Sequence, residues 1–259
     1  MRTTMTELIL VSDFDGTLYR GDAPVRHYAG LLAARLDPGP AARYLAALDR
    51  YLALGPAAAE QSTDTVEAAA LRESIDGWGA AFQLGRRVYG LDFDAIDQAF
   101  AATRVHMTET EMQLEPAGAL IEALRELRGT VRLVLATNSP LPGVDVLLRR
   151  LGAHELFDHV AGSLGKPDGL RRLLAAELGA EPGRSRAVAD PWRLLSIGDH
   201  WRNEIEPAVE IGAVTGYIDR FGRADGPATA TAVAAEQLLP VLRAWAGDPG
   251  RFSGPARSE

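Results

Sequence analysis

The chain has 259 residues, 47% of them hydrophobic, which is enough to bury a substantial core in one large or two ordinary domains. A formal net charge of −8 argues against nucleic acid and an anionic membrane surface as partners, because both select basic patches. Cysteine is absent, which excludes disulfide bonds, a thiol nucleophile and a cysteine zinc site. The apolar stretch near the N-terminus is too short for a secretion signal, so we expect a cytoplasmic protein.

Apolar runs of strand type recur along the chain, and helical patterns lie between them. The predicted strands cover residues 7–12, 131–139, 192–199 and 212–219. The predicted helices that alternate with them cover residues 118–129, 142–152, 167–179 and 204–212, and a closing helix is expected over 230–246. Repeated strand and helix units predict an α/β fold with a Rossmann-like, doubly wound parallel sheet and helices on both faces.

The stretch between the first two predicted strands has a different pattern. Its helical periodicity covers residues 29–36, 41–54, 65–90 and 92–107, without a convincing strand. We therefore predict a Rossmann-like core of residues 1–19 and 113–246, with an inserted all-helical domain of residues 20–112. Residues 247–259 are rich in Gly and Pro and are predicted to form a flexible tail.

Polar residues follow the predicted strands at the edge where doubly wound sheets bind ligands. Asp13 and Asp15 follow the first strand, Thr137, Asn138 and Ser139 close the second, and Asp199 closes the third. Because side chains alternate along a strand, the two neighbouring aspartates are expected to face the same way. Two carboxylates at the end of a buried run repel each other, which favours a functional site over an ordinary polar turn.

Lys166 is the only lysine beside 26 arginines, and it lies in the segment GSLGKPDGL, near the start of a predicted helix. A compact ammonium is not chemically equivalent to a planar guanidinium. The position of Lys166 between the second and third strands places it with the strand-end residues, which favours a role in the same site.

Four segments, DFDGT, LVLATNS, GKPDG and IGDHWRNEIEPA, resemble in order the four motifs of the haloacid dehalogenase-like (HAD) hydrolase superfamily. The resemblance covers residues 7–19 and 114–218, and the helical insert falls where that family places a C1-type cap. Dehalogenases of the family lack an acid at the position of Asp15, because a halide leaves without a proton. The resemblance therefore implies the phosphatase branch.

The resemblance also implies the role of each residue. Asp13 would attack phosphorus to form an aspartyl-phosphate, and Asp15 would protonate the departing alkoxide and then deprotonate water. Thr137 and Asn138 would contact the phosphoryl oxygens, and Lys166 would balance the charge of nucleophile and phosphate.

The turn after the aspartates is expected to serve the same site. Gly16 would let this turn pass close to the phosphate. Thr17 would order the turn through a hydrogen bond from its side chain to the backbone.

Mg²⁺ is the implied cofactor, because it prefers hard oxygen ligands. The resemblance assigns it the Asp13 carboxylate, the Asp15 main-chain carbonyl and the Asp199 carboxylate. The last motif commonly has a second Asp where this chain reads Asn203-Glu204. Glu204 is therefore expected to reach the metal through water or to hold the surroundings of Asp199.

The implied function is a Mg²⁺-dependent phosphatase for a small phosphorylated metabolite, with a cap that opens for substrate and closes against bulk water. Two alternatives remain open. One is a phosphomutase of the same superfamily, and the other is a non-catalytic protein that binds a phosphoester and serves regulation. Phosphate release that is lost in Asp13→Asn would separate the enzyme from the binding protein.

Overall fold

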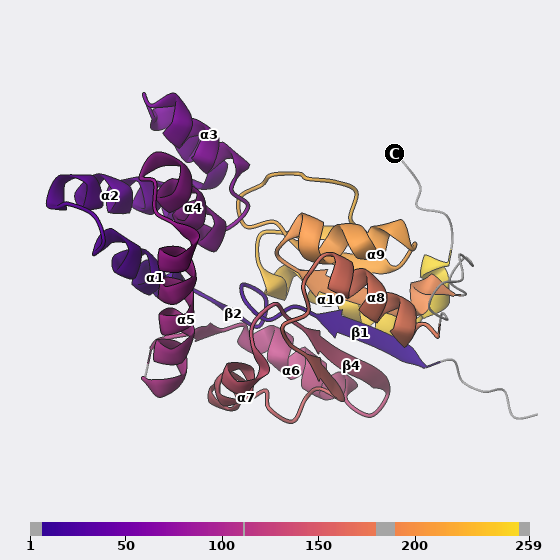
Figure 1. Ribbon diagram of the computed structural model, residues 1–259. Coiled ribbons are helices and arrows are strands. Elements are labelled where there is room, and N and C mark those ends of the chain that lie inside the picture. Colours follow the sequence, from indigo (N-terminus) through magenta and orange to yellow (C-terminus); the bar gives the residue numbers. More distant parts are fainter. Residues whose placement is uncertain (1–6, 111, 180–189, 254–259) are drawn as a thin grey trace, which may run out of the picture. The chain divides into compact units, whose positions relative to one another are not determined.

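The computed structural model describes residues 7–110, 112–179 and 190–253 (Figure 1). Contacts within the chain divide it into two compact units, which we call the core unit, Met1–Arg20 with Glu115–Glu259, and the helical unit, Gly21–Leu114. The chain leaves the core unit through β2 (Tyr19–Arg20) and re-enters it through β3 (Glu115–Pro116). These two short strands pair antiparallel. Both connections to the helical unit therefore start from one small ribbon.

The core unit is built on a parallel sheet. In the described part of the chain, six strands follow the order β5-β4-β1-β6-β7-β8. Their bounds are β1 (Leu8–Ser12), β4 (Val131–Ala136), β5 (His159–Ala161), β6 (Leu194–Gly198), β7 (Val214–Ile218) and β8 (Ala230–Ala232). Every neighbouring pair is parallel, and β1 lies between β4 and β6. The continuous apolar run of β1 suits this central position, because helices cover both faces of such a sheet.

Helices flank the sheet of the core unit. They are α6 (Gly118–Leu127), α7 (Leu141–Arg150), α8 (Asp168–Glu177), α9 (Glu206–Glu210) and α10 (Leu239–Gly247). Leu170 and Leu174 of α8 and Ala208 of α9 share a buried cluster with Ile9 and Val11 of β1. In Figure 1, α6 lies on the side of the sheet opposite α8, and it contacts α10. The predicted α/β class with a Rossmann-like sheet is confirmed.

Two edge strands, β5 and β8, are absent from the sequence prediction. Each has three residues, which are too few to show a strand pattern. Because residues 230–232 pair with β7, the closing helix expected over 230–246 is wrong at its start. A 3-10 turn, Ala235–Leu238, precedes α10, and Pro240 lies in the first turn of that helix, where its missing amide hydrogen is tolerated.

The C-terminal stretch that the sequence predicted as a flexible tail contains a further short element. Pro249–Phe252 forms a 3-10 helix directly after α10. Residues 254–259 lie outside the described residues, and so do 180–189, which separate α8 from the strand β6.

The helical unit contains α1 (Ala23–Ala33), α2 (Pro38–Leu54), α3 (Thr65–Glu73), α4 (Gly77–Gln83) and α5 (Phe93–Glu109), with a 3-10 helix at Gly55–Gln61 and a π-helical turn at Leu84–Val88. Asp64, Asp76 and Asp92 cap α3, α4 and α5 by accepting backbone N–H bonds. The buried Tyr44 and Tyr51 anchor the interior, each donating to a backbone carbonyl. Within the described residues, no helix combines the length and apolar character needed to cross a bilayer.

Candidate active site

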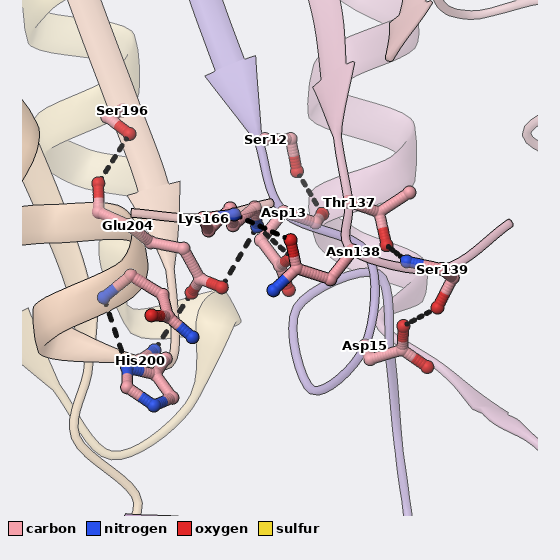
Figure 2. A network of polar contacts seen from close by, with 11 residues as sticks. Ser12, Asp13, Asp15, Thr137, Asn138, Ser139, Lys166, Ser196, His200 and Glu204 are labelled. Atoms are coloured by element: carbon pink, nitrogen blue, oxygen red, sulfur yellow. Dashed lines mark hydrogen bonds and ion pairs between the residues drawn. The ribbon is translucent and has the colours of Figure 1, made fainter. Parts of the chain in front are cut away.

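The predicted site residues lie in the core unit, beyond the C-terminal ends of β1, β4 and β6 (Figure 2). The N–H of Asp13 donates to the carbonyl of Ile197 over 2.9 Å, so Asp13 continues the pairing of β1 with β6. Asp15 lies beyond the strand, in a turn that is closed by a bond from Leu18 N to Phe14 O of 3.0 Å. The expectation that strand alternation orients both aspartates is therefore wrong, because the strand ends at Ser12 and Asp15 lies in the turn that follows.

Lys166 joins two carboxylates in the interior of the site. Its Nζ lies 2.5 Å from Asp13 Oδ1 and 3.0 Å from Glu204 Oε1. The three side chains are 2%, 6% and 8% exposed for Lys166, Asp13 and Glu204, respectively. An ion pair this deeply buried is not screened by solvent, so it fixes the positions of both carboxylates. The sequence prediction placed Lys166 beside Asp13, and the structure brings them together.

Glu204 lies on a π-helical turn, Trp201–Ile205, which is separated from the end of β6 by Asp199 and His200. Its Oε2 accepts the N–H of His200 over 2.9 Å, while its Oε1 accepts from Lys166. Both oxygens of Glu204 therefore hold neighbouring groups in place. This agrees with one of the two roles expected for it, to hold the surroundings of Asp199. The π-helical turn provides the bulge that brings this carboxylate back toward the strand end.

Asp199 lies next to these carboxylates. Asp13, Asp199 and Glu204 each offer an oxygen, and these oxygens lie within 4.8 Å of one another. Gly16 has φ +85°, and a Cβ at Gly16 would collide with the Asp199 carboxylate. Glycine is thus required in this turn for two reasons, the positive φ and the close approach of Asp199.

The residues fit a divalent cation. Asp13 Oδ2 is buried and has no hydrogen-bond partner among the described residues. When ionised, the carboxylates of Asp13, Asp199 and Glu204 against the single ammonium of Lys166 leave two uncompensated negative charges. Hard oxygen donors with such an excess of negative charge match the preference of Mg²⁺.

Burial and this charge balance together perturb the ionisation of the cluster. Burial, with the carboxylates of Glu204 and Asp15, raises the pKa of Asp13 to about 8, and Lys166 opposes this rise. Burial alone would lower the pKa of Lys166, but the carboxylates of Asp13 and Glu204 hold it above its ordinary value. The pKa shift of Asp13 thus arises mainly from burial, whereas that of Lys166 arises because two carboxylates lie beside one ammonium.

Asp15 is held by two hydroxyl groups. Tyr19 Oη donates to Asp15 Oδ1, and Ser139 Oγ donates to Asp15 Oδ2 over 2.8 Å. The sequence analysis grouped Ser139 with the strand-end residues but gave it no role, and it did not include Tyr19. Tyr19 is four residues after Asp15, so it could have been found by asking which hydroxyls flank the motifs.

Thr137 and Asn138 connect the end of β4 to the other site segments. Thr137 Oγ1 accepts the N–H of Ser139 over 3.0 Å. Asn138 Oδ1 accepts the N–H of Lys166 over 2.8 Å, which ties the lysine segment to the end of β4 (Figure 2). The side-chain oxygens of both residues therefore organise the loops around the site.

Thr17 does not form the side-chain hydrogen bond expected of it. Its Oγ1 is buried and has no partner among the residues that the structure describes. Backbone bonds to Phe14 O from the N–H groups of Thr17, at 3.4 Å, and Leu18, at 3.0 Å, order the turn instead.

The chain matches the family model of haloacid dehalogenase-like hydrolases over residues 9–191. No curated protein is similar enough in sequence to match it. Among solved structures, the chain is similar to the HAD-hydrolase YfnB from Bacillus subtilis bound to magnesium, with a TM-score of 0.56 and 19% identity over 91% of this chain and 98% of that one.

Two further solved structures share the fold. One is a predicted phosphoglycolate phosphatase from Haemophilus somnus, with a TM-score of 0.57 and 16% identity over 92% of this chain and 99% of that one. The other is the L-2-haloacid dehalogenase RSc1362, with a TM-score of 0.52 and 18% identity over 92% of this chain and all of that one. The match to the family model over most of the chain, together with the Rossmann-like core, shows that this protein belongs to the haloacid dehalogenase-like hydrolases.

Proposed function

We propose that this hydrolase is a Mg²⁺-dependent phosphatase that cleaves a small phosphorylated metabolite through an aspartyl-phosphate. The observation that carries the proposal is the different setting of two neighbouring aspartates. Asp13 is paired with Lys166 through one oxygen and has no hydrogen-bond partner among the described residues at the other. Asp15 is held by hydroxyl donors. One carboxylate is thus prepared for attack, and the other for proton transfer.

The carboxylates of Asp13 and Asp199 and the main-chain carbonyl of Asp15 would hold the cation, with Glu204 beside them. When bound, Mg²⁺ supplies positive charge that neutralises the carboxylates and the phosphoryl oxygens. Support comes from the oxygen cluster of this chain and from the magnesium bound to YfnB, which has the same fold.

Each residue then has one task in the reaction. An oxygen of Asp13 forms a bond to phosphorus while the ester P–O bond breaks, and Asp15 gives its proton to the departing alkoxide. Asp15 next takes a proton from water, whose oxygen attacks phosphorus and breaks the bond to Asp13. Inorganic phosphate leaves, and both aspartates are restored. Lys166 would balance charge throughout, with Thr137, Asn138 and the backbone at Gly16 around the phosphoryl group.

The choice of a phosphoester over a haloacid depends on Asp15. The similar folds include both a predicted phosphatase and a dehalogenase, so the fold alone does not select the substrate class. A halide leaves without a proton, whereas an alkoxide needs one. A carboxyl group held in place at position 15 therefore favours the ester.

The test is phosphate release from p-nitrophenyl phosphate and a panel of phosphomonoesters, with Mg²⁺ and with a chelator. We expect turnover that requires Mg²⁺ and falls at least about a thousandfold in Asp13→Asn, because the nucleophile is lost. Asp145→Asn is the matched control, because Asp145 pairs with Arg149 on an exposed helix surface. Acid-quenched protein is expected to carry one phosphoryl group on Asp13.

Three outcomes would contradict the proposal. They are chloride release from 2-chloropropionate without phosphatase activity, tight binding of a phosphoester without turnover, and full activity in Asp13→Asn. A phosphomutase would instead return the phosphoryl group to a second hydroxyl of its substrate and release little phosphate.

A further inference from the structure

The hydroxyls of Tyr19 and Ser139 contact opposite oxygens of the Asp15 carboxylate. A carboxyl group that must protonate a leaving oxygen has to point at it within hydrogen-bond reach. Free rotation about the side-chain bonds of Asp15 would spread the proton over many directions. Two donors, one on each oxygen, remove that freedom because they fix the plane of the carboxyl group.

Both donors are themselves fixed. Ser139 is 4% exposed, its N–H donates to Thr137 Oγ1, and its carbonyl accepts the N–H of Ser163 over 2.9 Å. Tyr19 is 3% exposed, and its ring packs edge-to-face on Phe14 with 5.4 Å between the ring centres. Neither hydroxyl has to be ordered at the moment of reaction, which is the property of a preorganised support.

The two donors reach Asp15 from separate parts of the chain. Tyr19 belongs to β2, the strand that leads into the helical unit, and it pairs with Pro116 of β3. Ser139 follows the end of β4, 124 residues away from Asp15. The direction of the Asp15 carboxyl group is therefore set by the assembly of the sheet and its ribbon, and not by the turn alone.

We propose that Tyr19 and Ser139 are positioning residues that hold Asp15 for proton transfer to the leaving oxygen. This rests on the proposed phosphatase function. A poorly aimed acid slows the departure of an alkoxide, which needs the proton, far more than the departure of p-nitrophenolate, which is stable as an anion. Loss of either hydroxyl should thus change the ratio of the activities on alkyl and aryl esters, whereas a general loss of fold would lower both activities equally.

The experiment measures kcat and KM of Tyr19→Phe and Ser139→Ala on p-nitrophenyl phosphate and on the primary alkyl phosphate that the wild type hydrolyses best. We expect kcat on the alkyl ester to fall about tenfold to a hundredfold with little change in KM, and activity on the aryl ester to fall less than about threefold. Tyr19→Phe keeps the ring that packs on Phe14. The matched control is Tyr217→Phe, since Tyr217 is buried in the same unit and donates to Asp225 over 2.7 Å. Tyr217→Phe should leave kcat and KM unchanged on both substrates.

An unchanged ratio between the two substrates in both variants, whether activity is kept or lost equally, would overturn the positioning role. If the wild type still shows Mg²⁺-dependent turnover, that result in the variants leaves the proposed function intact. A wild type that releases phosphate from no ester overturns the proposed function first, and the role of Tyr19 and Ser139 falls with it.

Discussion

Lys166 is singled out both by composition and by the chemistry of its site. The chain uses arginine at 26 positions, yet the buried cation between Asp13 and Glu204 is its single lysine. An ammonium is a compact donor on a flexible stem, and it contacts two carboxylates from one nitrogen. The Lys166 side chain is only 2% exposed, so its surroundings are closely packed. A bulkier, planar guanidinium at this position would displace one of the two carboxylates.

The ionisation of Asp13 predicts how Mg²⁺ binding depends on pH. Its pKa is raised from 3.8 to about 8, first by burial and then by Glu204 and Asp15. The metal-free folded protein thus keeps a proton that the unfolded chain loses near pH 3.8, so stability falls as pH rises between these values. Below about pH 8, Mg²⁺ has to displace this proton, and its affinity should rise by up to about tenfold per pH unit until the rise levels off.

Calorimetric titration of Mg²⁺ in two buffers of different ionisation enthalpy measures the Mg²⁺ affinity and the number of protons released on binding. We expect release of a proton at pH 6.5 and little release at pH 9, both unchanged in the surface control Asp145→Asn. Affinity independent of pH, without proton release, would show that Asp13 is already ionised in the metal-free protein.

At the scale of elements, the turn after β1 passes close to Asp199, which follows the end of β6. Gly16 and Gly129 have nearly the same φ, +85° and +84°, but only a Cβ at Gly16 would meet Asp199, while a Cβ at Gly129 would lie in open space. Gly129→Ala should cost about 1–2 kcal/mol for the left-handed backbone alone. Gly16→Ala should cost more and should weaken Mg²⁺ binding, because Asp199 has to move.

Urea unfolding of both variants, with Mg²⁺ titration of each, separates the two effects. Equal losses of stability together with unchanged Mg²⁺ affinity would mean that the contact with Asp199 does not matter. The pair is informative because backbone strain is matched and the contact is not.

At the scale of the whole molecule, the two units can be tested apart. Arg20 and Glu115 are paired across the ribbon of β2 and β3, and Ala117 N donates to Leu18 O over 2.9 Å. A chain in which residues 21–114 are replaced by Asn-Gly would close this ribbon with a two-residue hairpin turn. We expect it to fold cooperatively and to bind Mg²⁺, because the sheet and the acidic cluster both belong to the core unit.

Circular dichroism, thermal unfolding and Mg²⁺ titration of this shortened chain check the expectation, beside a separate chain of residues 21–114. The separate chain should be helical, since its buried tyrosines and capped helices make their contacts within the unit. A shortened chain that stays unfolded would show that the core unit depends on the helical unit for its stability.

The sequence by itself determined the α/β class, four of the six parallel strands found among the described residues, and the residues that gather at their ends. Buried strands and strand-end motifs are local patterns, so they can be recognised in the sequence. The tertiary structure alone decided the edge strands β5 and β8, which are too short to leave a pattern. It also decided the partners of Asp15, because Ser139 meets it across 124 residues and Tyr19 reaches it only through a turn that strand alternation does not describe. The structure likewise decided that Thr17 does not form the side-chain hydrogen bond expected of it. Backbone hydrogen bonds to Phe14 O, and not the Thr17 hydroxyl, close that turn. Motifs thus identify which groups meet, but the direction of each group depends on where the strands end and which segments pack beside them.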